Sequence, residues 1–135
     1  MDSFDLSALD TKKGAEAGAE LTLRHPKTNE LTPVKLLVLG YDSDAYQEAQ
    51  DERQRKRLER LPHHRPTVEE LNEDSLYVAS MLVAGFVTPL SLDGQALAYS
   101  RESAKTLLRR FPWVREQVED FAGKRGNFLP GSASS

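Results

Sequence analysis

The longest apolar run of the sequence, residues 78–87, sets the first constraint on the fold. Ser80 and Gly85 interrupt it, and it is much shorter than the roughly 20 apolar residues that a membrane-spanning helix needs. Upstream of the run, Thr67 and Glu70 have the spacing of a capping box. In this kind of helix start, each side chain accepts a hydrogen bond from the backbone amide of the other residue. The sequence therefore predicts one helix over residues 68–86, apolar nearly all round in its second half, as the central and most buried element.

Composition limits the classes of protein to which this chain can belong. Of its 135 residues, 39% are apolar and 29% are charged, which is the balance of one globular domain rather than of a disordered chain. The absence of cysteine excludes a disulfide-stapled secreted scaffold, a thiolate metal site and a cysteine nucleophile, and it fits a reducing cytoplasm. The formal net charge of −3 gives no global basic field that would draw the chain onto nucleic acid.

Two runs near the N-terminus predict a β-hairpin over residues 20–39. Residues 21–24 alternate apolar and polar side chains, which is the period of a half-buried strand, and residues 34–39 form the second run. Pro26 and Asn29 between them favour a turn, because proline fixes φ and asparagine tolerates a left-handed backbone. Pro33 lacks an amide hydrogen, so we expect it at the start of its strand or on an edge.

Both ends of the chain are expected to be flexible. Residues 1–19 contain Gly14 and Gly18, which weaken any helix there. Residues 130–135 are rich in Gly, Ser and Ala, a composition typical of flexible segments. We therefore expect a single domain over residues 20–129, with a flexible lead-in and a flexible tail.

Three further helices are predicted around the central one. A polar helix over residues 44–61 follows an Asp-Ser-Asp sequence, whose side chains can accept the free amide hydrogens of a helix start. Ser100 can cap a helix over residues 101–110, and Pro112 suits the first turn of a last helix. The fold class is therefore α+β and mostly α, with an N-terminal two-stranded β-hairpin followed by about four helices.

The acidic and histidine residues predict no complete metal site. Asp42 and Asp44 are one pair of carboxylates, only part of the six to eight oxygens that surround calcium, and helix capping explains both. His63 and His64 are adjacent and His25 is distant in sequence, whereas zinc needs three or four ligands, so a solvated linker is the simpler interpretation. We expect no metal and no cofactor.

Catalytic motifs are absent from the sequence. It has no nucleophile elbow around a serine, no phosphate-binding glycine loop and no dinucleotide fingerprint. Its 21 carboxylates offer accidental pairs, and nothing in the sequence indicates that any pair is buried. We therefore expect a protein that is not an enzyme.

A basic cluster occupies the second half of the helix predicted over residues 44–61. It consists of Arg53, Arg55, Lys56, Arg57 and Arg60, and such a cluster can bind phosphate. Acidic residues are interleaved with it, and basic residues are common at helix C-terminal ends. We interpret the cluster first as a solvated helix face and next as a protein-contact face. A small regulatory or nucleic-acid-binding adaptor using helix 53–60 is the alternative function.

Several apolar side chains are more than the apolar faces of the four predicted helices need for core packing. The segment after residue 88 has a tight-turn signal at Asp93-Gly94 and is otherwise ambiguous. We predict that the surplus side chains bind an apolar helical partner and mediate self-association through the same surface. They are Phe86, Leu90, Leu97, Tyr99 and Trp113. Trp113 lies one residue off its helical stripe, so both a core position and a partner-binding anchor remain open.

Two stretches of the sequence resemble tail assembly chaperones of long-tailed (siphovirus-type) bacteriophages. The first is Leu-Thr-Leu-Arg-His-Pro at residues 21–26 with Val-Leu-Gly-Tyr-Asp-Ser-Asp-Ala-Tyr at residues 38–46, followed by a polar basic helix. The second is Ser-Arg-Glu-Ser-Ala at residues 100–104 with Phe-Pro-Trp-Val-Arg-Glu-Gln-Val at residues 111–118 and Asn-Phe-Leu at residues 127–129. The resemblance covers residues 20–129, and patterns of helix and strand carry it rather than chemical motifs.

The resemblance implies a function without catalysis. Such chaperones are made in the infected cell, act in the host cytoplasm and are absent from the finished virion. They coat the long helical tape-measure protein, keep it soluble and help tail-tube subunits polymerise around it. The resemblance also implies a longer product made by ribosomal frameshifting, through which the tail-tube protein would be contacted. It supplies no catalytic or binding residues, and we expect neither a membrane nor nucleic acid as partner.

Overall fold

The computed structural model describes residues 3–130 and has the α+β architecture that the sequence predicts. Its main sheet has three antiparallel strands in the order β1 (Ala19–Arg24), β2 (Leu31–Val38) and β3 (Val83–Phe86). β1 and β2 confirm the predicted hairpin, and Asn29 in their turn has a left-handed φ of 63°. Pro33 lies near the start of β2, where the register against β1 shifts, a place that tolerates a missing amide hydrogen.

The third strand replaces the end of a predicted helix. α3 (Val68–Ser80) begins at its predicted cap but ends well short of residue 86. The chain turns at Leu82, and β3 pairs with the side of β2 that β1 leaves open, so the backbone groups there are satisfied. Valine and phenylalanine favour strands, and Gly85 disfavours a helix. Burial continues across the junction, because Val78, Ala79 and Ser80 at the end of α3 are buried as Leu82 and Val83 are, whereas Val68 at the start of α3 is 69% exposed.

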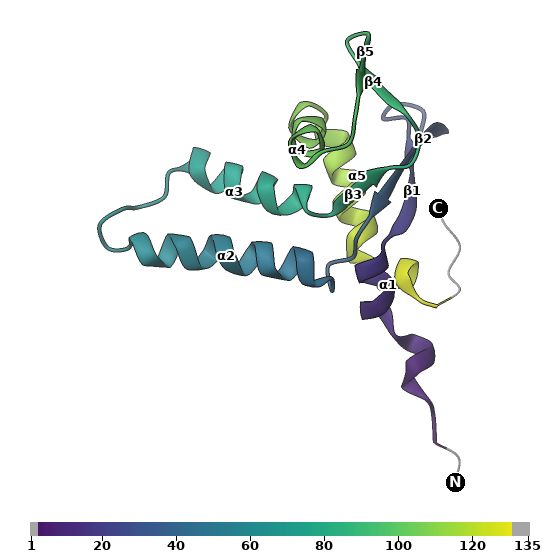
Figure 1. Ribbon diagram of the computed structural model, residues 1–135, viewed down its shortest axis with the longest axis horizontal. Helices are drawn as coiled ribbons and strands as arrows, with labels where there is room; N and C mark the ends of the chain where they lie inside the picture. The colour runs from purple at the N-terminus through teal and green to yellow at the C-terminus, as the bar shows by residue number, and fades with distance from the viewer. Residues whose placement is uncertain (1–2, 131–135) are drawn as a thin grey trace.

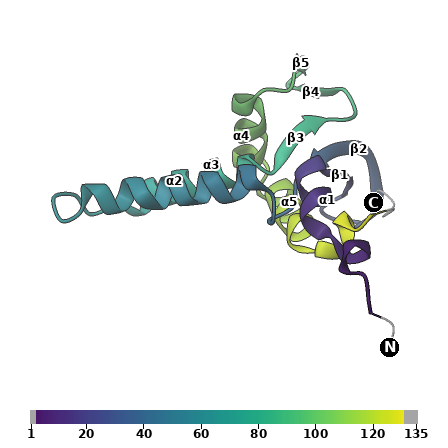
Figure 2. The ribbon, with the colours of Figure 1, turned by 60° about the horizontal axis from the view of Figure 1, so that its bottom comes forward.

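α2 (Asp44–Arg60) and α3 run side by side in opposite directions and extend away from the rest of the molecule (Figures 1 and 2). We call this pair of helices the arm. α3 buries Leu76, Val78 and Ala79, whereas α2 buries Ala49 and so contributes little apolar packing to the arm. The Arg53 guanidinium instead lies 3.9 Å from the centre of the Tyr77 ring and pairs with Asp74.

α4 (Arg101–Arg110) and α5 (Pro112–Gly123) begin where the sequence predicts. Ser100 and Ser103 bond each other's backbone amide in a capping box, and Pro112 occupies the first turn of α5. Both helices contribute to the core, which also takes side chains from the main sheet and from Leu82. The largest fully buried apolar side chains are Leu36, Val38, Leu82, Val83, Leu108, Val114 and Val118.

A packed helix lies within the segment that the sequence analysis predicts as a flexible lead-in, so that prediction is corrected. α1 (Thr11–Ala17) starts at Asp10, whose carboxylate accepts two backbone amide hydrogens of the first turn. Its Ala15 is 1% exposed. α1 packs against the 3-10 helix η2 (Arg125–Phe128), and a second 3-10 helix, η1 (Leu6–Leu9), precedes α1. Of the predicted tail, residues 131–135 lie outside the described residues.

A separate two-stranded sheet follows β3. β4 (Leu90–Leu92) and β5 (Gln95–Leu97) pair antiparallel, and we call them the β4–β5 hairpin. Asp93 and Gly94 form its turn with φ values of 53° and 79°, which confirms the turn signal in the sequence. Figure 1 shows this hairpin beyond the main sheet, on a different side of the body from the arm.

Candidate functional site

An apolar cleft brings together three of the five predicted partner-binding residues. Leu90 and Leu97, which pair across the β4–β5 hairpin, line the cleft together with Trp113. The cleft has a volume of about 160 Å³. The other lining residues are apolar except for one serine: Leu23, Val34, Ser91, Leu92, Leu107, Phe111 and Val114. A lining of this kind accommodates a hydrocarbon side chain rather than a polar ligand.

The floor of the cleft comes from the main sheet and from the junction of α4 and α5. Phe111 separates the two helices, and Trp113 lies in the first turn of α5. Their rings meet edge to face with centres 6.4 Å apart. Trp113 is half-buried and packs on the core, so one face supports the fold while another borders the cleft.

The other two predicted residues, Phe86 and Tyr99, lie at the base of the β4–β5 hairpin and are not among the cleft-lining residues. Their rings are edge to face with centres 5.3 Å apart. The Tyr99 hydroxyl donates a hydrogen bond of 2.8 Å to the Val83 carbonyl oxygen. These contacts brace the hairpin against β3, so in this structure the two side chains support the site rather than form it.

A larger groove between β1 and α5 adjoins the cleft at Trp113, which lines both. Its volume is about 650 Å³, and its lining includes the charged side chains of Arg24, Glu116, Asp120 and Lys124. Gln117 closes the edge of β1, because its side-chain amide accepts the Arg24 amide hydrogen at 2.8 Å and donates to the Arg24 carbonyl oxygen at 2.9 Å. Sequence reasoning missed this groove, since nothing local in the sequence places α5 beside β1.

The basic cluster of α2 is matched by carboxylates. Arg53 and Arg57 contact Asp74 of α3 at 3.7 and 3.1 Å, and Arg60 contacts Glu70 at 3.3 Å. Along α2 itself, Lys56 pairs with Glu52 at 3.0 Å and Arg55 with Glu59 at 3.9 Å. Arg53, Arg57 and Arg60 therefore join the two helices of the arm, a role that sequence spacing alone did not reveal.

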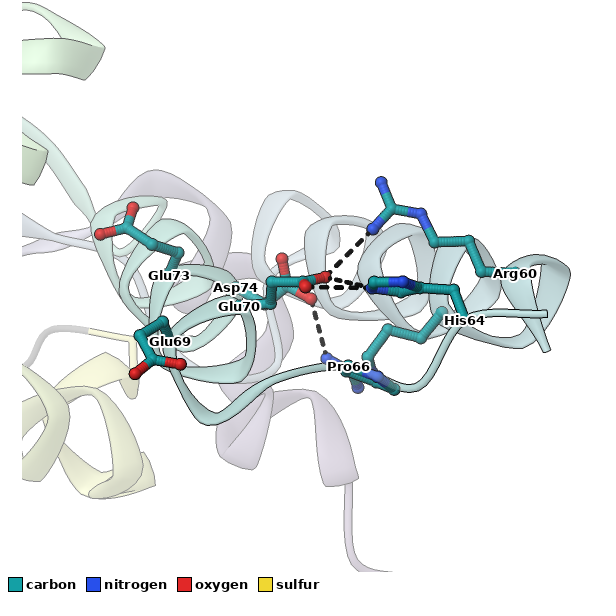
Figure 3. A pocket seen from close by; sticks show the side chains of 8 residues that line it. Arg60, His64, Pro66, Glu69, Glu70, Glu73 and Asp74 are labelled. Carbon is teal, nitrogen blue, oxygen red and sulfur yellow. Dashed lines mark hydrogen bonds and ion pairs between the residues drawn. The ribbon is translucent and has the colours of Figure 1, made fainter. Parts of the chain in front are cut away.

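Figure 3 shows the charged hollow at the far end of the arm, where Arg60 and His64 both point at Glu70. His64 Nε2 lies 2.9 and 3.0 Å from the two carboxylate oxygens. Hydrogen bonding to His64 holds the pKa of Glu70 below its usual value. His64 is thus tied to α3 rather than belonging to a purely solvated linker.

The two aspartates near the start of α2 do not cap it, which corrects the sequence interpretation. Ser43 is the cap, and its hydroxyl accepts the Tyr46 amide hydrogen at 3.4 Å. Asp42 instead accepts two hydrogen bonds from Arg125, at 2.7 and 3.0 Å, and this guanidinium holds the pKa of Asp42 below its ordinary value of 3.8. Asp44 pairs with Lys12 at 2.7 Å.

His25 shapes the turn between β1 and β2, where its Nδ1 accepts the amide hydrogens of Lys27 and Thr28. Within residues 3–130, no three His, Asp or Glu side chains come together in a cation-binding arrangement.

None of the helices formed by the described residues has the length and apolar character needed to cross a membrane. Comparisons with protein-family models, curated proteins and solved structures found no match. The cleft and the adjoining groove are therefore characterised by their own chemistry.

Proposed function

We propose that this protein is a tail assembly chaperone of a long-tailed bacteriophage. In this proposal, the chaperone binds the tape-measure protein in the host cytoplasm, is absent from the mature virion and is not an enzyme. The observation that carries the proposal is the apolar cleft next to a charged groove, with Trp113 between them. An amphipathic helix docks by inserting apolar side chains into such a cleft while its polar face meets the charged rim. A tape-measure protein is a long helical client of this kind.

The size of the cleft favours weak, repeated contacts with the client. About 160 Å³ accepts a side chain rather than a whole structural element, so one copy of the chaperone grips one short stretch of a long helix. Many copies along the client, in contact with one another, gain affinity through avidity. In this proposal, self-association aligns the copies, and tail-tube subunits then polymerise around the coated client.

Co-expression with the tape-measure protein of the same phage tests the proposal. The soluble fraction of the tape-measure protein is expected to rise with the wild-type chain. It is expected to fall back with Leu97→Asp, because a carboxylate over the apolar cleft opposes the docking of apolar side chains. A thermal melt of Leu97→Asp checks that the variant is folded.

Leu58→Asp is the matched control. Leu58 is a leucine of the arm with 61% exposure, and it does not line the cleft. This variant is expected to keep the client soluble. Equal client solubility with and without the wild-type chain contradicts the proposed function. Loss with Leu58→Asp but not with Leu97→Asp places the client on the arm instead.

A further inference from the structure

The tip of the β4–β5 hairpin is tied to the end of α4. Asp93, in the hairpin turn, accepts hydrogen bonds of 2.6 and 2.8 Å from two nitrogens of Arg110, the last residue of α4. The Asp93 side chain is 67% exposed and the Arg110 side chain is 46% exposed. A contact of this kind between exposed groups has good geometry and modest strength.

The base of the hairpin is anchored on both legs. On the leg that leads into β4, Thr88 Oγ1 accepts the Lys35 amide hydrogen at 2.8 Å. On the leg that leaves β5, Tyr99 bonds the Val83 carbonyl oxygen and packs its ring on Phe86. Both anchors lie on the main sheet, so the base stays fixed to the body.

Between base and tip, the hairpin spans a space that it does not fill. Leu90, Leu92 and Leu97 are half-buried above the unfilled cleft of about 160 Å³. Protein interiors are normally close-packed, and side chains that face a void lose dispersion contacts. A hairpin with strands of three residues has little stability of its own. The middle of this hairpin is therefore held less firmly than its base.

We propose that the β4–β5 hairpin is a flap over the apolar cleft, hinged at Thr88 and Tyr99 and latched by the Asp93–Arg110 ion pair. The structure shows the latched state. Release of the latch lets the hairpin swing from the body and exposes the cleft floor to an incoming apolar side chain. The identity of that group as a client helix rests on the proposed function, whereas the motion itself does not.

Because the chain has no native cysteine, a single introduced thiol reports on the flap without background. Val114→Cys places the thiol on the cleft floor, at a position that is 2% exposed. Val118→Cys, one turn further along α5, places it at a fully buried position that does not line the cleft. The measurement is the rate of maleimide labelling of each folded variant in the absence of any client.

Asp93→Asn releases the latch and preserves the turn, because asparagine adopts the left-handed conformation readily and Asn-Gly is a favoured hairpin turn. Labelling of Val114→Cys is expected to become about two- to fivefold faster, as for the loss of one surface ion pair. Labelling of Val118→Cys is expected to stay unchanged. Glu73→Gln is the control, since it removes ion pairs with Arg109, one residue away from Arg110 on α4, and with Lys105, and neither pair involves the hairpin.

Arg110→Gln is expected to reproduce the effect, and the double variant with Asp93→Asn to add little, because both remove the same interaction. Equal acceleration of labelling in Val114→Cys and Val118→Cys means that the whole core loosens, and this result overturns the flap proposal. No acceleration at position 114, or the same acceleration with Glu73→Gln, also overturns it. Labelling needs no client, so failure of the solubilisation assay and failure of the flap are separate outcomes.

Discussion

At Gly14, the backbone of α1 lies directly against the carbonyl group of Phe128, and a Cβ there would sit 1.9 Å from the carbonyl oxygen. Gly40 makes a similar approach, since its Cβ would sit 2.6 Å from that of Ala15. These two glycines let α1, η2 and the segment before α2 meet at close range. From the sequence alone, Gly14 suggests a weak helix and a flexible segment. Its packing partner, Phe128, lies near the other end of the chain, so the sequence does not reveal the contact.

Gly14→Ala is expected to destabilise the protein, although alanine favours helices by about 1 kcal/mol over glycine. The added methyl group overlaps backbone atoms that cannot rotate away, so the free energy of unfolding should fall by about 1–3 kcal/mol, as in other overpacked sites. Urea denaturation measures the change. Gly126→Ala is the control, because a Cβ there meets nothing within 4 Å. Equal effects of the two substitutions would contradict the close contact.

The contacts of the two aspartates near the start of α2 also involve distant residues. The Asp-Ser-Asp sequence before α2 offers three chemically suitable caps, and propensity does not rank them decisively. Ser43, directly before the first residue of α2, caps the helix in the structure, and the two aspartates pair with Arg125 and Lys12. Neither partner is close in sequence, so local pattern could not identify them.

Among the elements, those specified by local turn and cap chemistry were predicted correctly. The β1–β2 hairpin, the Asp93-Gly94 turn and the starts of α2 to α5 agree with the structure. The run over residues 78–87 was assigned wrongly beyond Ser80, because a short apolar run has no period that distinguishes a helix from a buried strand. The free edge of β2, far away in sequence, makes β3 a strand.

The joint between α1, η2 and the start of α2 is expected to respond to acid. Arg125 lowers the pKa of Asp42 below 3.8 in the folded protein, so the ion pair contributes stability above the unfolded-state pKa. That contribution is lost as the pH falls through the folded-state pKa. The difference in unfolding free energy between wild type and Asp42→Asn should be constant above about pH 5 and shrink toward pH 3.

Urea denaturation at a series of pH values measures this difference. Arg125→Gln should show the same dependence, because it removes the other half of the pair. A difference that grows on acidification, or one that does not change between about pH 5 and pH 3, would contradict the assignment of Asp42 as a stabilising carboxylate.

On the scale of the whole molecule, the sequence predicted the helices of the arm but not that they extend from the body. The sequence shows the thin apolar stripe of α2. It does not show the ion pairs between α2 and α3, because these depend on how the two helices align. The candidate site follows the same rule. A surplus of apolar residues predicted all five as one partner-binding set, and only tertiary packing separates Leu90, Leu97 and Trp113, which line the cleft, from Phe86 and Tyr99, which brace the hairpin.

The arm also bears on the alternative function in nucleic-acid binding. Each basic residue of the cluster on α2 has a carboxylate within 4.0 Å. A phosphate would have to displace that carboxylate, which weakens the electrostatic gain from releasing counterions. In a gel shift at about 150 mM salt, the wild-type chain is therefore expected to retain neither DNA nor RNA.

Asp74→Asn sharpens this test, because it removes the shared carboxylate partner of Arg53 and Arg57. The variant is expected to gain weak binding at low salt that disappears at about 150 mM, the behaviour of a few uncompensated charges. A wild-type complex that persists at about 150 mM and weakens when Arg55 and Lys56 are replaced by glutamine would favour the adaptor over the chaperone. In that case the arm, with its helices displayed away from the body, would be the functional element, and the cleft would be a feature of packing.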